Sequence, residues 1–214
     1  MAISPKQKQK KLEKKNKKRT LVKKTLRETL LSKNKASTYA ECPVHECLVS
    51  NILFDQGLGT VIVTRHTPDG MFAISAFVVD IYCMGVKNAF FYVASEYEYE
   101  DDFKPRVIAS HEDQQLEKVH IACAKKLIEG AVDYAKELGF SPHSDYPKAK
   151  DIFGDIDVEA CPVKYEYGRE GRPFYIRGPN ESLARARGIV NQLDRKCGEG
   201  NYGYLVGLEA PYEE

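Results

Sequence analysis

Apolar and polar positions alternate along much of the first half of the chain. Four segments there are rich in β-branched and aliphatic residues, which favours β-strands. The segments are residues 44–54, 59–66, 71–83 and 86–94. Pro68, Asp69 and Gly70 give a strong turn signal between the second and third, because Pro fixes φ and Gly accepts positive φ. The pattern therefore predicts an N-terminal antiparallel β-meander.

The third segment, residues 71–83, is apolar on both of its alternating faces. One face carries Phe72, Ile74, Ala76 and Val78, and the other carries Ala73, Phe77, Val79 and Ile81. A strand of this kind is expected between two packed layers. Its 13 residues exceed the usual strand length, so we expect a bulge or bend near Asp80.

Helical spacing dominates the second half. A long helix is predicted from an N-cap at Ser110 to Gly139, and a shorter one at residues 146–153. Residues 95–105 are expected to form an acidic loop, and residues 164–177 a second small hairpin around the turn 168–171. A further helix beginning at Gly178 and ending at Gly198, with a last strand at 202–206, completes an α+β class. Residues 36–214 are expected to form a single α+β domain, with a subdivision near 140–160 as the alternative.

Charge divides the chain into two unlike parts. Residues 1–35 hold 14 Lys and Arg against two acidic residues, a net charge of +12. Residues 36–214 hold 18 basic and 29 acidic residues, a net charge of −11. The near-neutral total thus conceals a basic tail, expected to be disordered or helical, joined to an acidic body.

The tail predicts a polyanionic partner, because lysines neutralise phosphates and release counterions. The candidate nucleic-acid-binding residues are Lys10, Lys11, Lys14, Lys15, Lys17, Lys18, Arg19, Lys23 and Lys24. The tail contains no aromatic residue, so base stacking is not implied. We expect an RNA- or ribosome-associated binding protein. A solubilising tail, a tail that folds back on the acidic body and an anionic membrane remain alternatives.

Cysteine usage and hydropathy bear on location. The six cysteines are Cys42, Cys47, Cys83, Cys123, Cys161 and Cys197. Several lie inside apolar patterns, which favours reduced thiols in a cytoplasmic protein over a disulfide framework. No apolar run approaches the roughly 20 residues of a membrane span, and no signal-peptide core follows the basic N-terminus, so neither a span nor export is expected.

Asp80 is the first candidate for site chemistry, because a carboxylate inside an apolar run needs a partner. Asp80 and Lys87 flank a turn that contains Cys83 and Gly85. A thiol-dependent hydrolase or transferase would use Cys83 as nucleophile, His45 or His66 as base and Asp80 as orienting group. The simpler interpretation is a structural Asp80–Lys87 pair beside a buried cysteine.

Three weaker candidates remain. Cys42, His45 and Cys47 have ligand chemistry for zinc, with Cys161 as a fourth ligand, but half-buried strand residues explain them as well. If 44–54 is a strand, His45 and Cys47 share one face. Arg172 and Arg177 precede a helix start that could bind an anion, unless they form exposed ion pairs. The acidic, tyrosine-rich residues 97–103 suggest a protein-interaction surface for a basic partner. No cofactor is expected apart from this zinc candidate.

Two stretches of the body resemble a family of uncharacterised bacterial proteins. They are Asp69–Ala73 with Phe77–Lys87, and Phe153–Asp157 with Cys161 and Pro162. The resemblance covers most of the body and not the basic tail. It implies a bacterial cytoplasmic source and carries no activity, cofactor or ligand.

Overall fold

A computed structural model of the chain describes residues 35–206, so residues 1–34 of the basic tail, which include its nine candidate residues, lie outside the described part. The helical elements are η1 (Ala36–Tyr39), α2 (Leu53–Gln56), the π-helical η2 (Glu98–Phe103), α3 (Lys104–Ile108), α4 (Ile121–Glu137), α5 (Tyr146–Ala149), η3 (Lys150–Phe153), η4 (Val158–Ala160) and α6 (Leu183–Cys197). The strands are β1 (Val44–Ser50), β2 (Leu58–His66), β3 (Phe72–Asp80), β4 (Gly85–Ala94), β5 (Leu116–Lys118), β6 (Phe174–Ile176) and β7 (Gly203–Leu205).

The main sheet has five strands in the order β4-β3-β2-β1-β5, and all its neighbours pair antiparallel. The predicted meander is therefore confirmed, as is the α+β class. Each of the four strands predicted for the meander is found, although β1 stops at Ser50 and the short helix α2 begins at Leu53, within the segment 44–54.

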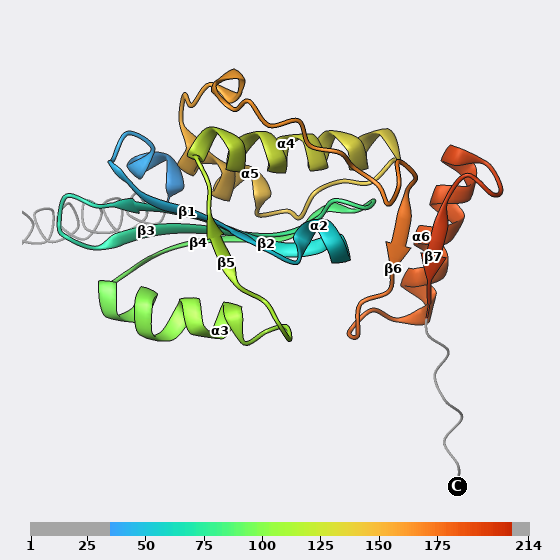
Figure 1. Cartoon of the computed structure of the whole chain (residues 1–214), viewed down its shortest axis with the longest axis horizontal. Coiled ribbons are helices and arrows are strands. Elements are labelled where there is room, and N and C mark those ends of the chain that lie inside the picture. The colour runs from blue at the N-terminus through green and yellow to red at the C-terminus, as the bar shows by residue number, and fades with distance from the viewer. Residues whose placement is uncertain (1–34, 207–214) are drawn as a thin grey trace, which may run out of the picture.

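The sheet lies between two layers, as the two apolar faces of β3 predict (Figure 1). Helix α4 covers one face, where Ala73, Phe77 and Val79 are buried. Segment η2–α3 covers the other, where Phe72 and Ile74 pack against the fully buried Tyr99. The 3-10 helices η1 and η3 and helix α5 complete the layer of α4.

The acidic segment 95–105 is helical, so the predicted loop is wrong. Glu98 accepts hydrogen bonds from the backbone N–H and hydroxyl of Ser95, both at 2.8 Å, which fixes the start of η2. Glu100 forms an ion pair with Lys104, one helical turn later. The ring of Tyr99 is buried against the sheet face that carries Phe72 and Ile74. Burial of Tyr99 and these local pairs thus convert an acidic run into helix.

The helix predicted from an N-cap at Ser110 has its N-cap ten residues later, at His120. Residues 116–118 form β5, which pairs with β1 at the sheet edge, and His120 caps α4 through Nδ1. Asp113 has a φ of 60°, which interrupts any helix between Ser110 and Ile121. The end is as predicted, because Gly139 follows with a φ of 85°.

A smaller layer formed by β6, α6 and β7 lies at the end of the main sheet that carries α2 (Figure 1). Strands β6 and β7 pair parallel, with Tyr175 opposite Tyr204. The predicted second hairpin is therefore wrong; only the bridge between Arg169 and Arg172 remains of it. Helix α6 begins at Leu183 rather than Gly178, because Ser182 caps it, and it ends at Gly198 as predicted.

No helix in the part of the chain that the structure describes is long and apolar enough to cross a lipid bilayer.

Candidate functional site

Asp80 ends β3 and organises the β3–β4 turn. Its Oδ1 accepts the backbone N–H groups of Tyr82 at 3.0 Å and Cys83 at 2.9 Å. Burial raises the pKa of the Asp80 carboxyl, against the opposing effect of these amides and of the Lys87 charge. The predicted bend is therefore real, and the sheet also has a register shift between Val78 and Val79.

Lys87 lies near Asp80 but forms its ion pair with another residue. Its Nζ lies 3.1 Å from Oε1 of Glu181. The other oxygen of Glu181 accepts the Tyr175 hydroxyl at 2.6 Å and the Gly178 N–H at 3.1 Å. Burial opposes ionisation of Glu181, but these hydrogen bonds and Lys87 together lower its pKa. The pair that joins the main sheet to the smaller layer is thus Lys87–Glu181, not Asp80–Lys87.

A pocket with a volume of about 400 Å³ opens between the main sheet and the smaller layer. We call it the interlayer pocket. Its lining residues are Asp55, Gln56, Gly57, Leu58, Asp80, Tyr82, Lys87, His111, Arg169, Phe174, Ile176, Arg177, Gly178 and Pro179. Asp80 and Tyr82 are buried and form its floor, while Asp55, His111 and Arg169 are exposed at its mouth. Charged groups of both signs therefore face one cavity.

Of the two arginines predicted to bind an anion, the structure places one, Arg177, in the lining of this pocket. Arg177 lines the pocket and donates from Nε to the carbonyl oxygen of Glu181 at 2.7 Å, whereas Arg172 is exposed and does not line it. Arg169, which sequence reasoning missed, lies over the Phe174 ring at 4.8 Å. The Gly-rich turn around Arg169 gave a signal for a turn, but none for a cavity.

The structure does not assemble the proposed thiol site. Cys83 is fully buried, and burial together with the nearby Asp80 raises the pKa of its thiol. His66 pairs with Phe72 at one end of the β2–β3 ladder, and Asp80 pairs with Leu58 at the other. His45 Nδ1 lies 3.2 Å from His66 Nε2, at the same remote end. Neither imidazole can act as a base for Cys83.

A register shift in β1 separates His45 from the two cysteines of the predicted zinc site. The shift between Val44 and Glu46 turns His45 toward Phe72, whose ring stacks on it at 4.4 Å. Cys47 lies instead on the α4 face, where burial raises the pKa of its thiol to about 12. Cys42 also packs on that face. The expectation that His45 and Cys47 share a face is thus wrong, because a β-bulge changes the alternation.

Within residues 35–206, His45, Glu46 and Glu100 bring ligand atoms within 4.8 Å of one another. A cation already occupies this position, because Lys104 Nζ lies 2.9 Å from Glu46 and 2.8 Å from Glu100. Burial opposes ionisation of Glu46, but hydrogen bonds from Lys104 and Tyr99 and a contact with Lys118 lower its pKa. The cluster is thus part of an internal ion-pair network with Lys104 and Lys118.

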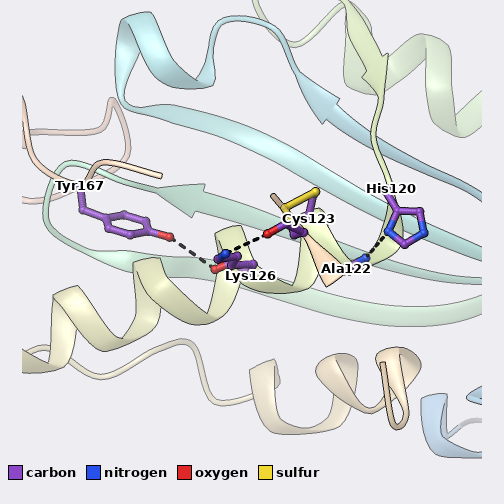
Figure 2. Close-up of a disulfide and its surroundings, with 6 residues drawn as sticks. His120, Ala122, Cys123, Lys126 and Tyr167 are labelled. Atoms are coloured by element: carbon purple, nitrogen blue, oxygen red, sulfur yellow. Dashed lines mark hydrogen bonds between the residues drawn. A yellow bond between two sulfur atoms is a disulfide. The ribbon is translucent and has the colours of Figure 1, made fainter. Parts of the chain in front are cut away.

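Two of the cysteines form a disulfide, so the expectation of six reduced thiols is wrong. Cys123 in α4 is bonded to Cys161, and their Cα atoms are 4.9 Å apart (Figure 2). Both are buried, and Lys126 Nζ donates to the Cys161 carbonyl oxygen at 3.0 Å. The spacing of 38 residues hid the pairing, since no local pattern marks it. The remaining described cysteines, Cys42, Cys47, Cys83 and Cys197, are free.

The disulfide begins a chain of contacts that leads to the interlayer pocket. Tyr167 follows six residues after Cys161, and its ring points toward α4 (Figure 2). Its hydroxyl donates to the carbonyl oxygens of Lys126, at 3.4 Å, and Leu127, at 3.1 Å. The Gly168 N–H donates to the carbonyl oxygen of Ile81 at 2.8 Å, and the Phe174 N–H donates to the carbonyl oxygen of Tyr82 at 3.2 Å. The segment that carries Arg169 is therefore held against both α4 and the β3–β4 turn.

Comparison of the chain with protein-family models, with curated proteins and with solved structures finds no match.

Proposed function

We propose that the protein is a non-enzymatic RNA-associated binding protein, in which residues 1–35 supply affinity for phosphates. The observation that carries this proposal is the separation of charge, +12 in residues 1–35 against −11 in residues 36–214. An acidic body repels a polyanion, so affinity has to come from the tail. The body would then contribute shape recognition or hold a protein partner.

The enzymatic alternative has less support, because Cys83 is buried and both histidines are remote from it. The protein-interaction alternative keeps one observation in its favour. Tyr97, at the start of the acidic helical segment, is 72% exposed, whereas Tyr99 is fully buried. A cytoplasmic location belongs to the same proposal as RNA binding, although disulfides such as Cys123–Cys161 are rare in that compartment.

Binding of a fluorescent single-stranded RNA to the full chain and to a chain lacking residues 1–35 tests the proposal. We expect the full chain to bind at about 50 mM salt and to lose about 10³-fold in affinity by 200 mM, because released counterions drive the association. The truncated chain should bind at least about 100-fold more weakly at the lower salt concentration.

The matched control replaces three basic residues of the body, Lys136, Lys148 and Arg195, with glutamine. These side chains belong to exposed residues, so their loss should leave folding and RNA affinity almost unchanged. A truncated chain that binds RNA as tightly as the full chain would overturn the proposal. So would an affinity of the full chain that does not depend on salt.

A further inference from the structure

The interlayer pocket has the dimensions of a small-molecule site. Its volume of about 400 Å³ falls in the range of about 300–1,000 Å³ that such sites occupy. Apolar groups of Leu58, Phe174 and Ile176 line it beside the charged groups. An apolar wall with a few convergent polar groups is the usual composition of a ligand pocket.

The basic groups of the pocket favour an anionic part of the ligand. Within residues 35–206 the Arg169 guanidinium lies over the Phe174 ring, and no carboxylate of that part forms an ion pair with it. Stacking holds its planar donors in place at the mouth, where a phosphate can accept two hydrogen bonds. Lys87, whose Nζ is paired with Glu181, and Arg177 line the same cavity, so basic side chains are present there in an otherwise acidic body.

The acidic groups favour a second, hydrogen-bond-donating part. Asp55 at the mouth and Asp80 on the floor both line this space, and Oδ2 of Asp80 is not used by the two backbone amides that bind Oδ1. Two carboxyls disfavour a bare polyanion, but they accept hydrogen bonds from hydroxyl or amino groups. A ligand that combines a phosphate, hydroxyl donors and an apolar or aromatic body matches all three parts of the lining.

We propose that the interlayer pocket binds a nucleoside monophosphate, with the phosphate on Arg169, the sugar hydroxyls toward the carboxyls and the base against the apolar wall. This site does not depend on the basic tail, so it goes beyond the RNA association proposed above. The same chemistry can come from a free nucleotide or from the 5′-phosphorylated end of an RNA.

Calorimetric titration of the full chain with AMP and with adenosine, at 150 mM salt, tests the site. We expect one AMP per chain, and affinity for adenosine at least about tenfold lower, because the phosphate contributes charge-assisted hydrogen bonds. Arg169→Gln should weaken AMP binding at least about tenfold, since it removes the guanidinium and keeps a polar side chain. The matched control is Arg172→Gln, which changes an exposed arginine three residues away, outside the pocket lining.

The control should bind AMP like the unaltered chain, and both variants should keep the unaltered melting temperature. Equal affinity for AMP and adenosine would overturn the proposal. So would AMP affinity unaffected by Arg169→Gln, which is the result expected if the lysine tail alone binds the phosphate. An oligonucleotide pair with and without a 5′-phosphate then identifies the source. If Arg169→Gln weakens binding of the phosphorylated oligonucleotide but not of the unphosphorylated one, the ligand is an RNA end. If it weakens binding of neither, the ligand is the free nucleotide.

Discussion

Two buried carboxylates, Asp80 and Glu46, illustrate how neighbouring groups decide the charge of a side chain. Burial disfavours the ionised form of Asp80, so the pKa of its carboxyl group rises although two backbone amides donate to it. Glu46 is also buried, but Lys104, Tyr99 and Lys118 surround it and its pKa falls. The two residues therefore contribute to stability with opposite dependence on pH.

Asp80→Asn tests the effect of the buried charge. Because the pKa of Asp80 in the folded state lies above its ordinary value of 3.8, its contribution is greatest below that value and falls as pH rises through the raised pKa. Asparagine keeps an acceptor for the two amides and cannot ionise. The free energy of unfolding of the variant relative to the unaltered chain should therefore increase from pH 4 to pH 7, as measured by urea denaturation.

Glu46→Gln provides the comparison with the opposite sign. Because the pKa of Glu46 in the folded state is lowered, Glu46 stabilises the fold above its ordinary pKa of 4.5. This contribution is lost as pH falls through the lowered pKa. The variant should be destabilised at pH 7 and progressively less so toward pH 3. Curves of the same sign for the two variants would contradict the assigned environments.

The four free cysteines should differ in reactivity. Cys47 and Cys83 are buried and their thiol pKa values are raised, so almost no thiolate forms at pH 8. Cys42 and Cys197 are partly exposed. We expect iodoacetamide to label the second pair at least about tenfold faster than the first, as followed by mass spectrometry of peptides.

Labelling in denaturant is the control, because all free thiols should then react at similar rates. Fast labelling of Cys83 in the folded protein would restore the thiol-dependent enzyme as a candidate.

Sequence reasoning located Asp80 because a carboxylate in an apolar run is unusual. It did not identify Glu181 as the partner of Lys87, since these residues are far apart in the chain and come together only when the smaller layer packs on the sheet. It also misplaced His45, because a bulge of one residue at β1 changes the face of a side chain without leaving a mark in the hydrophobic pattern.

At the scale of elements, the disulfide joins α4 to the segment that leads into the interlayer pocket. The cross-link spans 38 residues, and restricting an unfolded chain over that distance contributes about 3–4 kcal/mol. The double variant Cys123→Ser, Cys161→Ser should therefore lose about 3 kcal/mol in the free energy of unfolding. Urea denaturation without reductant measures this loss.

The matched control is Cys42→Ser with Cys197→Ser, which removes two free thiols and should cost less than about 1 kcal/mol. Thiol titration in denaturant adds an independent readout, with four reactive groups expected in the unaltered chain before reduction and six after it. Six before reduction, with no stability loss in the first double variant, would show that the bond does not form in solution.

The strands of the main sheet were predictable because β3 is apolar on both faces and turn residues separate it from β2. Residues 116–118 were not, because Leu116 fits the helical stripe of α4 equally well and only pairing with β1 decides between them. The parallel pairing of β6 with β7 was also beyond local patterns. It depends on a strand that lies after the whole of α6.

At the scale of the whole molecule, the interlayer pocket draws its lining from segments that are distant in sequence. Its lining combines residues 55–58 with Asp80, Tyr82, Lys87, His111, Arg169, Phe174 and residues 176–179, and no motif links them. The charge separation, in contrast, is a property of composition and needs no fold to be recognised. The sequence therefore supports a partner class for the tail, while the pocket emerges only from the three-dimensional arrangement.

The parallel pairing of β6 and β7 has a consequence for the order in which the protein matures during synthesis. The five strands of the main sheet have all emerged once residue 118 is made, whereas β6 has β7, at residues 203–205, as its strand partner within the described residues. Chains fold from the N-terminus as they are made, so the pairing of β6, which carries Phe174 and Ile176 of the pocket wall, is the last to be completed. A chain released before residue 203 would keep its sheet and lack a finished pocket. Occupancy of the pocket would then distinguish complete chains from prematurely ended ones.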